Sequence, residues 1–98
     1  MKLYSIYNSL TEIYNPPFVA RDDTDAIEMV RKAIIVGRDI SLLVELDNMQ
    51  LECIGDFNEK NSFFDNGPAY VVVSLDYIKL PEHVKTLIAK LKEVKENQ

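Results

Sequence analysis

The sequence contains one cysteine, one histidine, three glycines and no tryptophan in 98 residues. Its single cysteine, Cys53, cannot form a disulfide within the chain, so we expect a protein of a reducing, intracellular compartment. One cysteine and one histidine cannot supply the ligands of a Cys/His zinc site. Gly37, Gly55 and Gly67 lie too far apart to form a glycine-rich loop that binds phosphate. We therefore expect no metal and no nucleotide cofactor.

Long apolar runs are also missing. The longest are Ile34 to Val36 and Ala69 to Val73, whereas a membrane-spanning helix needs about 20 apolar residues. Residues 1–5 open no apolar run of signal-peptide length. At a typical size of roughly 100 to 200 residues per domain, the chain has room for one core. We predict a single domain over residues 1–98 and no membrane association.

Basic residues are outnumbered, with 11 Lys and Arg against 16 Asp and Glu, for a net charge of -5. This charge repels a phosphate backbone at long range. The balance is uneven, because residues 79–98 hold five basic and three acidic side chains and the rest of the chain holds six and thirteen. Any nucleic-acid site must therefore be a local basic patch, and the C-terminal end has the greatest positive potential.

The side chains that commonly perform catalysis are few and have structural explanations. His83 falls in the first turn of a predicted helix, where an exposed histidine is ordinary. Cys53 alternates with apolar residues in a predicted strand, which is typical of a small buried hydrophobe. The acidic run Asp22 to Asp25 lacks the ligand spacing of a calcium loop and is typical of a helix N-cap. We therefore predict that the protein is not an enzyme.

The N-terminal half predicts one strand and one helix. Lys2 to Asn8 is rich in aromatic and apolar residues, which favours a strand, and Pro16-Pro17 prevents its continuation. Phe18 to Ala20 is a candidate for a short pairing with that strand. From about Thr24 to Val36 the apolar residues recur on one face of a helical wheel, and Gly37 is a candidate for the helix end.

The second half predicts more strands and a final helix. Met49 to Phe57 alternates like a strand, with Gly55 permitting a bulge, and a hairpin connection follows. Ala69 to Leu75 is apolar on both faces, which predicts the centre of the sheet. Ile40 to Leu46 is too short for its period to distinguish a helical turn from a strand. Pro81 in a first turn begins a helix with an apolar stripe.

These elements occur in the order β-α-β-β-β-α. Strands grouped in the middle of the chain, with the helices separated from one another, indicate an α+β fold. We predict a mainly antiparallel sheet of about four strands, with two helices packed on one face.

Candidate nucleic-acid contacts come from the last helix and the first strand. Lys85 and Lys92 are seven residues apart and share a helix face, and Lys79 lies just before it, so the three could follow phosphates. On the first strand, Lys2 beside Tyr4 could form a small platform for base stacking. The alternatives are that the lysines only complement the helix dipole and that the tyrosine fills the core.

Three short segments carry a resemblance to a known family. Met1-Lys2-Leu3-Tyr4-Ser5-Ile6-Tyr7, then Pro16-Pro17-Phe18-Val19-Ala20 before a helix, and Leu51-Glu52-Cys53-Ile54-Gly55-Asp56-Phe57-Asn58 ahead of a hairpin agree in order and spacing. Together they resemble the small non-structural protein of gokushoviruses, which are tailless phages with circular single-stranded DNA. The resemblance spans about the first sixty residues.

The resemblance implies an accessory protein in the host bacterial cytoplasm that is not built into the capsid. It would support viral DNA replication or the switch to single-stranded genome synthesis, without catalytic residues. Our first hypothesis is weak contact with single-stranded DNA through Lys2, Tyr4, Lys79, Lys85 and Lys92. The alternative is a dimeric interaction module that docks on the phage replication initiator or a host replication protein without DNA contact. Ile35, an apolar residue on the polar side of its helix, and the strand Val71 to Val73 motivate this alternative.

Overall fold

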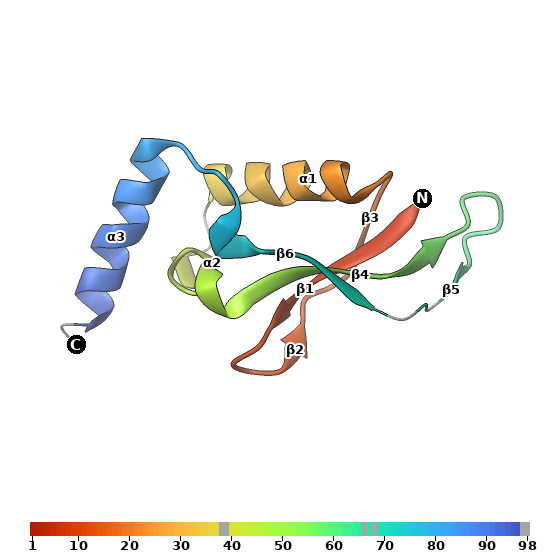
Figure 1. The fold of residues 1–98 in the computed structure, drawn as a ribbon, viewed down its shortest axis with the longest axis horizontal. Coiled ribbons are helices and arrows are strands. Elements are labelled where there is room, and N and C mark those ends of the chain that lie inside the picture. The colour runs from red at the N-terminus through yellow and green to blue at the C-terminus, as the bar shows by residue number, and fades with distance from the viewer. Residues whose placement is uncertain (38–39, 66, 68, 97–98) are drawn as a thin grey trace.

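The computed structural model describes residues 1–37, 40–65, 67 and 69–96. Its main feature is an antiparallel sheet whose two central strands are β1 (Lys2–Asn8) and β4 (Met49–Phe57) (Figure 1). Two short strands, β2 (Ile13–Tyr14) and β3 (Phe18–Ala20), share the outer edge of β1. Two more, β5 (Phe64–Asp65) and β6 (Tyr70–Ser74), share the outer edge of β4.

The predicted fold class is confirmed, since the structure is α+β and its strand pairs are antiparallel. The sheet contains six strands, two more than expected, because each outer position is divided between two short segments. At one end of the central pair the strand order is β2-β1-β4-β6, and at the other end it is β3-β1-β4-β5. The short pairing predicted for residues 18–20 is present as β3.

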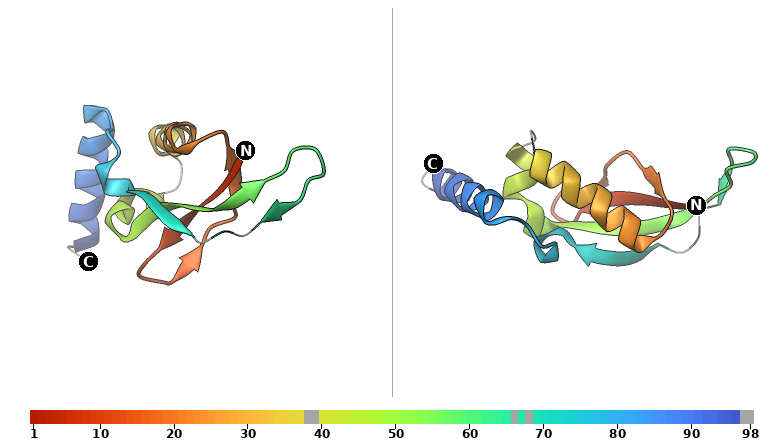
Figure 2. Two further views of the ribbon diagram at one scale, coloured as in Figure 1. Left: turned by 45° about the vertical axis from the view of Figure 1, so that its right-hand side comes forward. Right: turned by 90° about the horizontal axis from the view of Figure 1, so that it is seen from above.

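The helices divide between one face and one end of the sheet. Helix α1 (Asp23–Val36) runs over the sheet, whereas α2 (Ile40–Val44), η1 (Leu46–Asn48), η2 (Leu75–Tyr77) and α3 (Glu82–Glu96) gather at one end (Figures 1 and 2). The second predicted helix therefore packs against α2 and not across the sheet. The molecule is elongated, with extents of 49 × 26 × 19 Å.

Helix α1 begins and ends within one residue of its prediction. At its start the Asp22 side chain accepts a hydrogen bond from the Asp25 N–H at 2.8 Å, which satisfies a free backbone donor. Its buried stripe of Ala26, Val30 and Ile34 faces the sheet. At its end a Cβ on Gly37 would lie 2.4 Å from the Ile34 carbonyl oxygen. Close approach to the last turn therefore favours glycine there, and its backbone is not left-handed.

The core lies between α1 and the two central strands. Tyr4 of β1 is paired with Cys53 of β4, and both are buried. The register between β1 and β4 shifts just before this pair, so that Ile54 is the extra residue beside Gly55. This is the bulge predicted near that glycine. Beyond the bulge, β4 continues to Phe57 and into the hairpin that returns through β5.

The prediction that residues 69–75 form the sheet centre is wrong. Among the described residues β6 pairs with β4 alone, and Tyr70 and Val71 are 43% and 54% exposed. The central strands instead contain buried polar residues whose hydrogen bonds are satisfied. Ser5 donates to the Asn15 carbonyl at 2.7 Å, and Glu52 accepts from neighbouring side chains. Because these polar residues interrupt the apolar pattern, hydrophobicity alone ranked the strands in the wrong order.

The segment that the sequence left ambiguous, 40–46, is helical, as α2 and the start of η1. Its Leu43 and Leu46 are buried in the common core. A short apolar run can take either conformation, and packing against the end of the sheet decides in favour of helix here.

We predict that Leu51→Ala, in the middle of β4, lowers the free energy of unfolding by about 2–5 kcal/mol, because it removes a fully buried side chain and leaves a cavity. Leu10→Ala is the matched control. Leu10 is exposed in the turn after β1, so the change should stay within about 0.5 kcal/mol. Urea unfolding followed by circular dichroism measures both, and equal losses would contradict the assigned core.

Candidate nucleic-acid interface

Tyr4 belongs to the core and not to a binding surface. It is fully buried, its ring lies 5.9 Å from that of Phe18, and its hydroxyl donates to Asp23 Oδ1 at 2.7 Å. The prediction that Tyr4 offers a base-stacking platform is therefore wrong. Lys2 lies close to it at the start of β1, where its Nζ is 3.4 Å from the Tyr70 hydroxyl and 5.9 Å from the centre of that ring.

Asp23 joins α1 to two strands. Besides Tyr4 from β1, Tyr70 from β6 donates its hydroxyl to both carboxylate oxygens, at 3.0 and 3.3 Å. Burial raises the pKa of Tyr4, and the bond to Asp23 raises it further. A hydrogen bond with Cys53 raises the pKa of Tyr70, with burial and the bond to Asp23 adding to it. Both phenols are thus held neutral, as donors in a structural contact that we call the Asp23 latch.

Two of the candidate lysines line a groove beside α3. Lys85 and Lys92 form one wall, and the rest of the lining is apolar apart from Asp76. The groove has a volume of about 360 Å³, and its apolar residues are Leu46, Ile78, Leu80, Ile88 and Ala89. Lys85 also approaches Glu82, with Nζ 3.6 Å from Oε1. The result is a small hydrophobic surface bordered by cations.

Lys79 lies at the edge of this groove. It is exposed, and its two neighbours in the chain, Ile78 and Leu80, both line the groove. Its carbonyl oxygen accepts a hydrogen bond of 3.0 Å from Arg31 Nε on α1. Sequence reasoning missed Arg31, because nothing in its own helix points to a partner 48 residues away. We call Arg31, Lys79, Lys85 and Lys92 the basic end.

The five predicted residues therefore do not form one site. Lys85 and Lys92 line one groove, Lys79 lies between two residues of its lining, and Tyr4 is buried. Lys2 follows the N-terminal residue, which lies far along the sheet from α3 (Figure 1).

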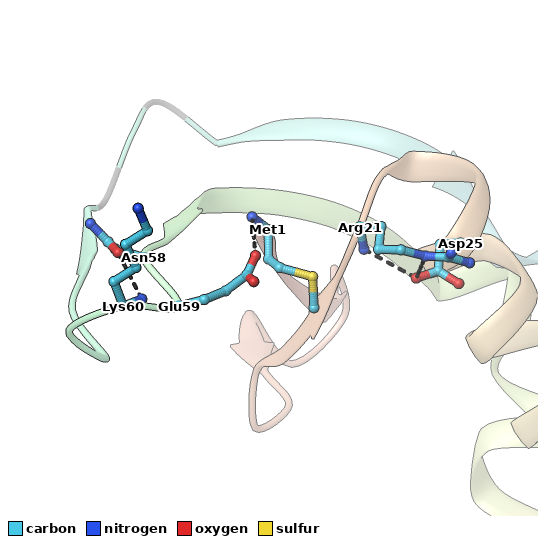
Figure 3. A network of polar contacts seen from close by, with 6 residues as sticks. All are labelled: Met1, Arg21, Asp25, Asn58, Glu59 and Lys60. Atoms are coloured by element: carbon cyan, nitrogen blue, oxygen red, sulfur yellow. Dashed lines mark hydrogen bonds and ion pairs between the residues drawn. The ribbon is translucent and has the colours of Figure 1, made fainter.

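The larger cavity, of about 730 Å³, lies at the tip of the β4–β5 hairpin and is acidic. Its lining includes Asp56, Glu59 and Asp65, with Lys60 as its one lysine. The amino group of Met1 pairs with Glu59 at 3.2 Å (Figure 3). Because carboxylates repel phosphate, this cavity is a poor nucleic-acid site despite its size.

The same view contains the start of α1 (Figure 3). There Asp25 accepts hydrogen bonds from the backbone and side-chain N–H groups of Arg21, which lower the pKa of this carboxyl. The Arg21 side chain is therefore already paired with a carboxylate of its own chain.

The groups considered for catalysis and metal binding have ordinary surroundings. Cys53 is buried, with its sulfur 3.8 Å from the Gly55 carbonyl oxygen, and His83 is exposed on α3. Across the described ranges, no three His, Cys, Asp or Glu side chains are grouped so that they could hold a metal ion. Each described helix is too short or too polar to cross a membrane.

Comparison with known proteins gives one match. The family model described as Phage ORF5 protein matches residues 1–78. No curated protein and no solved structure matches the chain. The matched range contains the whole sheet, α1, α2 and η2, and it ends before Lys79 and α3.

The latch predicts how stability depends on pH. An unfolded tyrosine loses its proton near pH 10, whereas folding keeps Tyr4 protonated to higher pH. The contribution of Tyr4 to the free energy of unfolding is therefore constant below about pH 10 and is lost above it. Tyr4→Phe should lose about 1 kcal/mol at neutral pH with the hydrogen bond. Above pH 10 the free energy of unfolding of this variant should fall less steeply than that of the wild type, by up to about 1.4 kcal/mol per pH unit.

Urea unfolding at a series of pH values between neutral and strongly alkaline measures this decline. Phe18→Leu is the control, because it changes the ring beside Tyr4 without removing a titrating group. It should lower stability and leave the alkaline slope as in the wild type. Equal slopes for all three proteins would contradict the latch.

Proposed function

The chain belongs to the Phage ORF5 protein family, and on that premise we propose that it is a non-catalytic, non-structural phage protein of the gokushovirus type. It supports viral DNA replication or the switch to single-stranded genome synthesis in the host bacterial cytoplasm. It does so by weak contact with single-stranded DNA, and it uses neither a metal nor a cofactor.

The observation that carries this proposal is the basic end. In a chain with a net charge of -5, Lys85 and Lys92 line a mostly apolar groove, and Lys79, whose carbonyl oxygen accepts a hydrogen bond from Arg31, lies between two residues of that lining. Lys85 and Lys92 are about 10.5 Å apart along the helix axis, given a rise of about 1.5 Å per residue. That spacing lets both touch one extended strand, with a sugar or base edge against the apolar floor.

Carboxylates limit the affinity of this contact. Asp76 lines the same groove, and Glu82 pairs with Lys85. Few phosphates can therefore release counterions, which makes the expected binding weak and sensitive to salt. A weak contact suits a protein that must leave the strand as the genome is synthesised or packaged.

The absence of catalysis is supported by the surroundings of the two reactive side chains. His83 is exposed on α3 and Cys53 is buried in β4, so these two side chains do not form a base–nucleophile pair. A reproducible turnover that His83→Ala abolishes would contradict this part of the proposal.

We predict that the double variant Lys85→Gln/Lys92→Gln weakens binding to a labelled single-stranded oligonucleotide and reduces its salt dependence. Each phosphate contact contributes about 0.7 to the slope of log K against log salt for single strands, so losing two should reduce the slope by about 1.4. Lys60→Gln is the control, since this exposed lysine lies in the acidic hairpin. No binding by the wild type at low salt would remove DNA contact from the proposed function.

A second candidate function is protein docking through β6. Within the described part of the chain, one edge of this strand has no partner, and its exposed residues Tyr70 and Val71 carry no charge. In this alternative, the protein forms a dimer and docks on the phage replication initiator or a host replication protein without DNA contact. Ile35 does not support it, because this residue packs against the core.

If β6 joins two copies, sedimentation equilibrium should give twice the chain mass of 11.3 kDa. Val71→Lys should then give a monomer, because it introduces like charges across the contact. Val36→Lys, the same change at an exposed residue at the end of α1, should leave the dimer intact. A wild-type monomer at the highest soluble concentration, or two equally dimeric variants, would contradict self-association through β6.

A further inference from the structure

We propose that Tyr77 is the residue on which a base of single-stranded DNA stacks, beside phosphates held by Lys79 and Arg31. This inference rests on the proposed function and adds a base contact to it. It replaces the stacking role that the sequence gave to the buried Tyr4.

Exposure and charge together select Tyr77 among the aromatic residues. Tyr77 and Phe63 are the most exposed described aromatics, at 78% and 72%. Phe63 and its neighbour Phe64 belong to the acidic hairpin, where carboxylates repel a phosphate chain. Tyr77 is followed two residues later by Lys79, at the basic end. It therefore combines an open ring face with cations close enough for the flanking phosphates.

The other exposed tyrosines already have partners. Tyr14 donates its hydroxyl to Glu52 at 2.9 Å, and its ring lies 4.6 Å from that of Tyr7. Tyr70 is held by the Asp23 latch. Each therefore has a carboxylate as a direct neighbour, which disfavours an approaching phosphate.

The local backbone presents Tyr77 outward. It is the last residue of η2, whose turn is closed by the N–H of Ile78 donating to the Leu75 carbonyl at 3.2 Å. Ile78 is buried and anchors the segment. The alternate residues Asp76, Ile78 and Leu80 line the groove. Tyr77 and Lys79 are exposed and are not among the residues that line it.

Arg31 and Ser74 complete the environment. Arg31 reaches the backbone of this segment, since its Nε donates to the Lys79 carbonyl oxygen. Asp76 is the nearest carboxylate in the chain, and its Oδ1 accepts a hydrogen bond from the Ser74 hydroxyl while the residue lines the groove. The segment Tyr77 to Lys79, with Arg31 bonded to it, therefore presents one exposed aromatic ring and two cations, which fits a base and its flanking phosphates.

The experiment compares two probes of equal length and charge, a labelled oligomer of thymidine nucleotides and one of abasic nucleotides. Fluorescence anisotropy at low salt measures both dissociation constants. Stacking on one ring should make the wild type prefer the thymidine probe by about 5- to 150-fold. Tyr77→Ala should lose most of this preference and keep the wild-type salt slope, because its phosphate contacts are intact. Tyr77→Phe should keep the preference, since it retains the ring.

Phe63→Ala is the matched control, because it removes an equally exposed ring from the acidic hairpin and should change neither dissociation constant. Far-UV circular dichroism of each variant checks that it is folded. If the wild type binds neither probe, DNA contact fails and this inference fails with it. If the wild type binds but does not prefer thymidine, or Tyr77→Ala keeps the preference, the proposed phosphate contact stands and the role of Tyr77 is overturned.

Discussion

The Asp23 latch is the interaction on which the arrangement of the other elements depends. One carboxylate at the start of α1 accepts hydrogen bonds from tyrosine hydroxyls of β1 and β6, two strands that pair with opposite edges of β4. The latch thereby fixes the helix over the sheet at the end where its two central strands pair beside the bulge. Because the latch uses the hydroxyls of Tyr4 and Tyr70, these two tyrosines have a structural role. The surfaces considered for a partner are the basic end and the outer edge of β6, and Tyr70 of β6 belongs to the latch.

Several features of the fold follow from the sequence because their causes are local. The strand 2–8, the helix beginning near residue 24 and the strand 49–57 each carry their own periodicity and end signals, and all are present. The bulge beside Gly55 follows from the same reasoning. Which strands are central and which lie at the edge does not follow from local sequence. The reason is that Ser5 and Glu52 are buried on central strands through hydrogen bonds to distant residues.

The candidate site was only partly predictable for a similar reason. Lys85 and Lys92 share a helix face by spacing alone, and the structure places both on one groove. Arg31 reaches this region only through a contact between α1 and the segment before α3, which no local pattern encodes. Tyr4 has an aromatic side chain of the kind that stacks on bases, but the placement of α1 buries it. Sequence spacing therefore locates residues on an element, and tertiary packing decides which of them meet solvent.

The net charge of -5 is compatible with contact to DNA because charge is distributed along an elongated molecule. The acidic hairpin between β4 and β5 and the basic end lie at opposite ends of the long axis (Figure 1). The molecule extends 49 Å along that axis, whereas the Debye length at physiological ionic strength is about 8 Å. A phosphate at the basic end is therefore screened from the hairpin carboxylates and responds to the nearby cations. At lower ionic strength the repulsion between phosphate and the hairpin carboxylates reaches further. In the proposed contact, this repulsion would point the acidic end of the molecule away from the DNA strand, so the charge distribution that weakens the contact would also orient it.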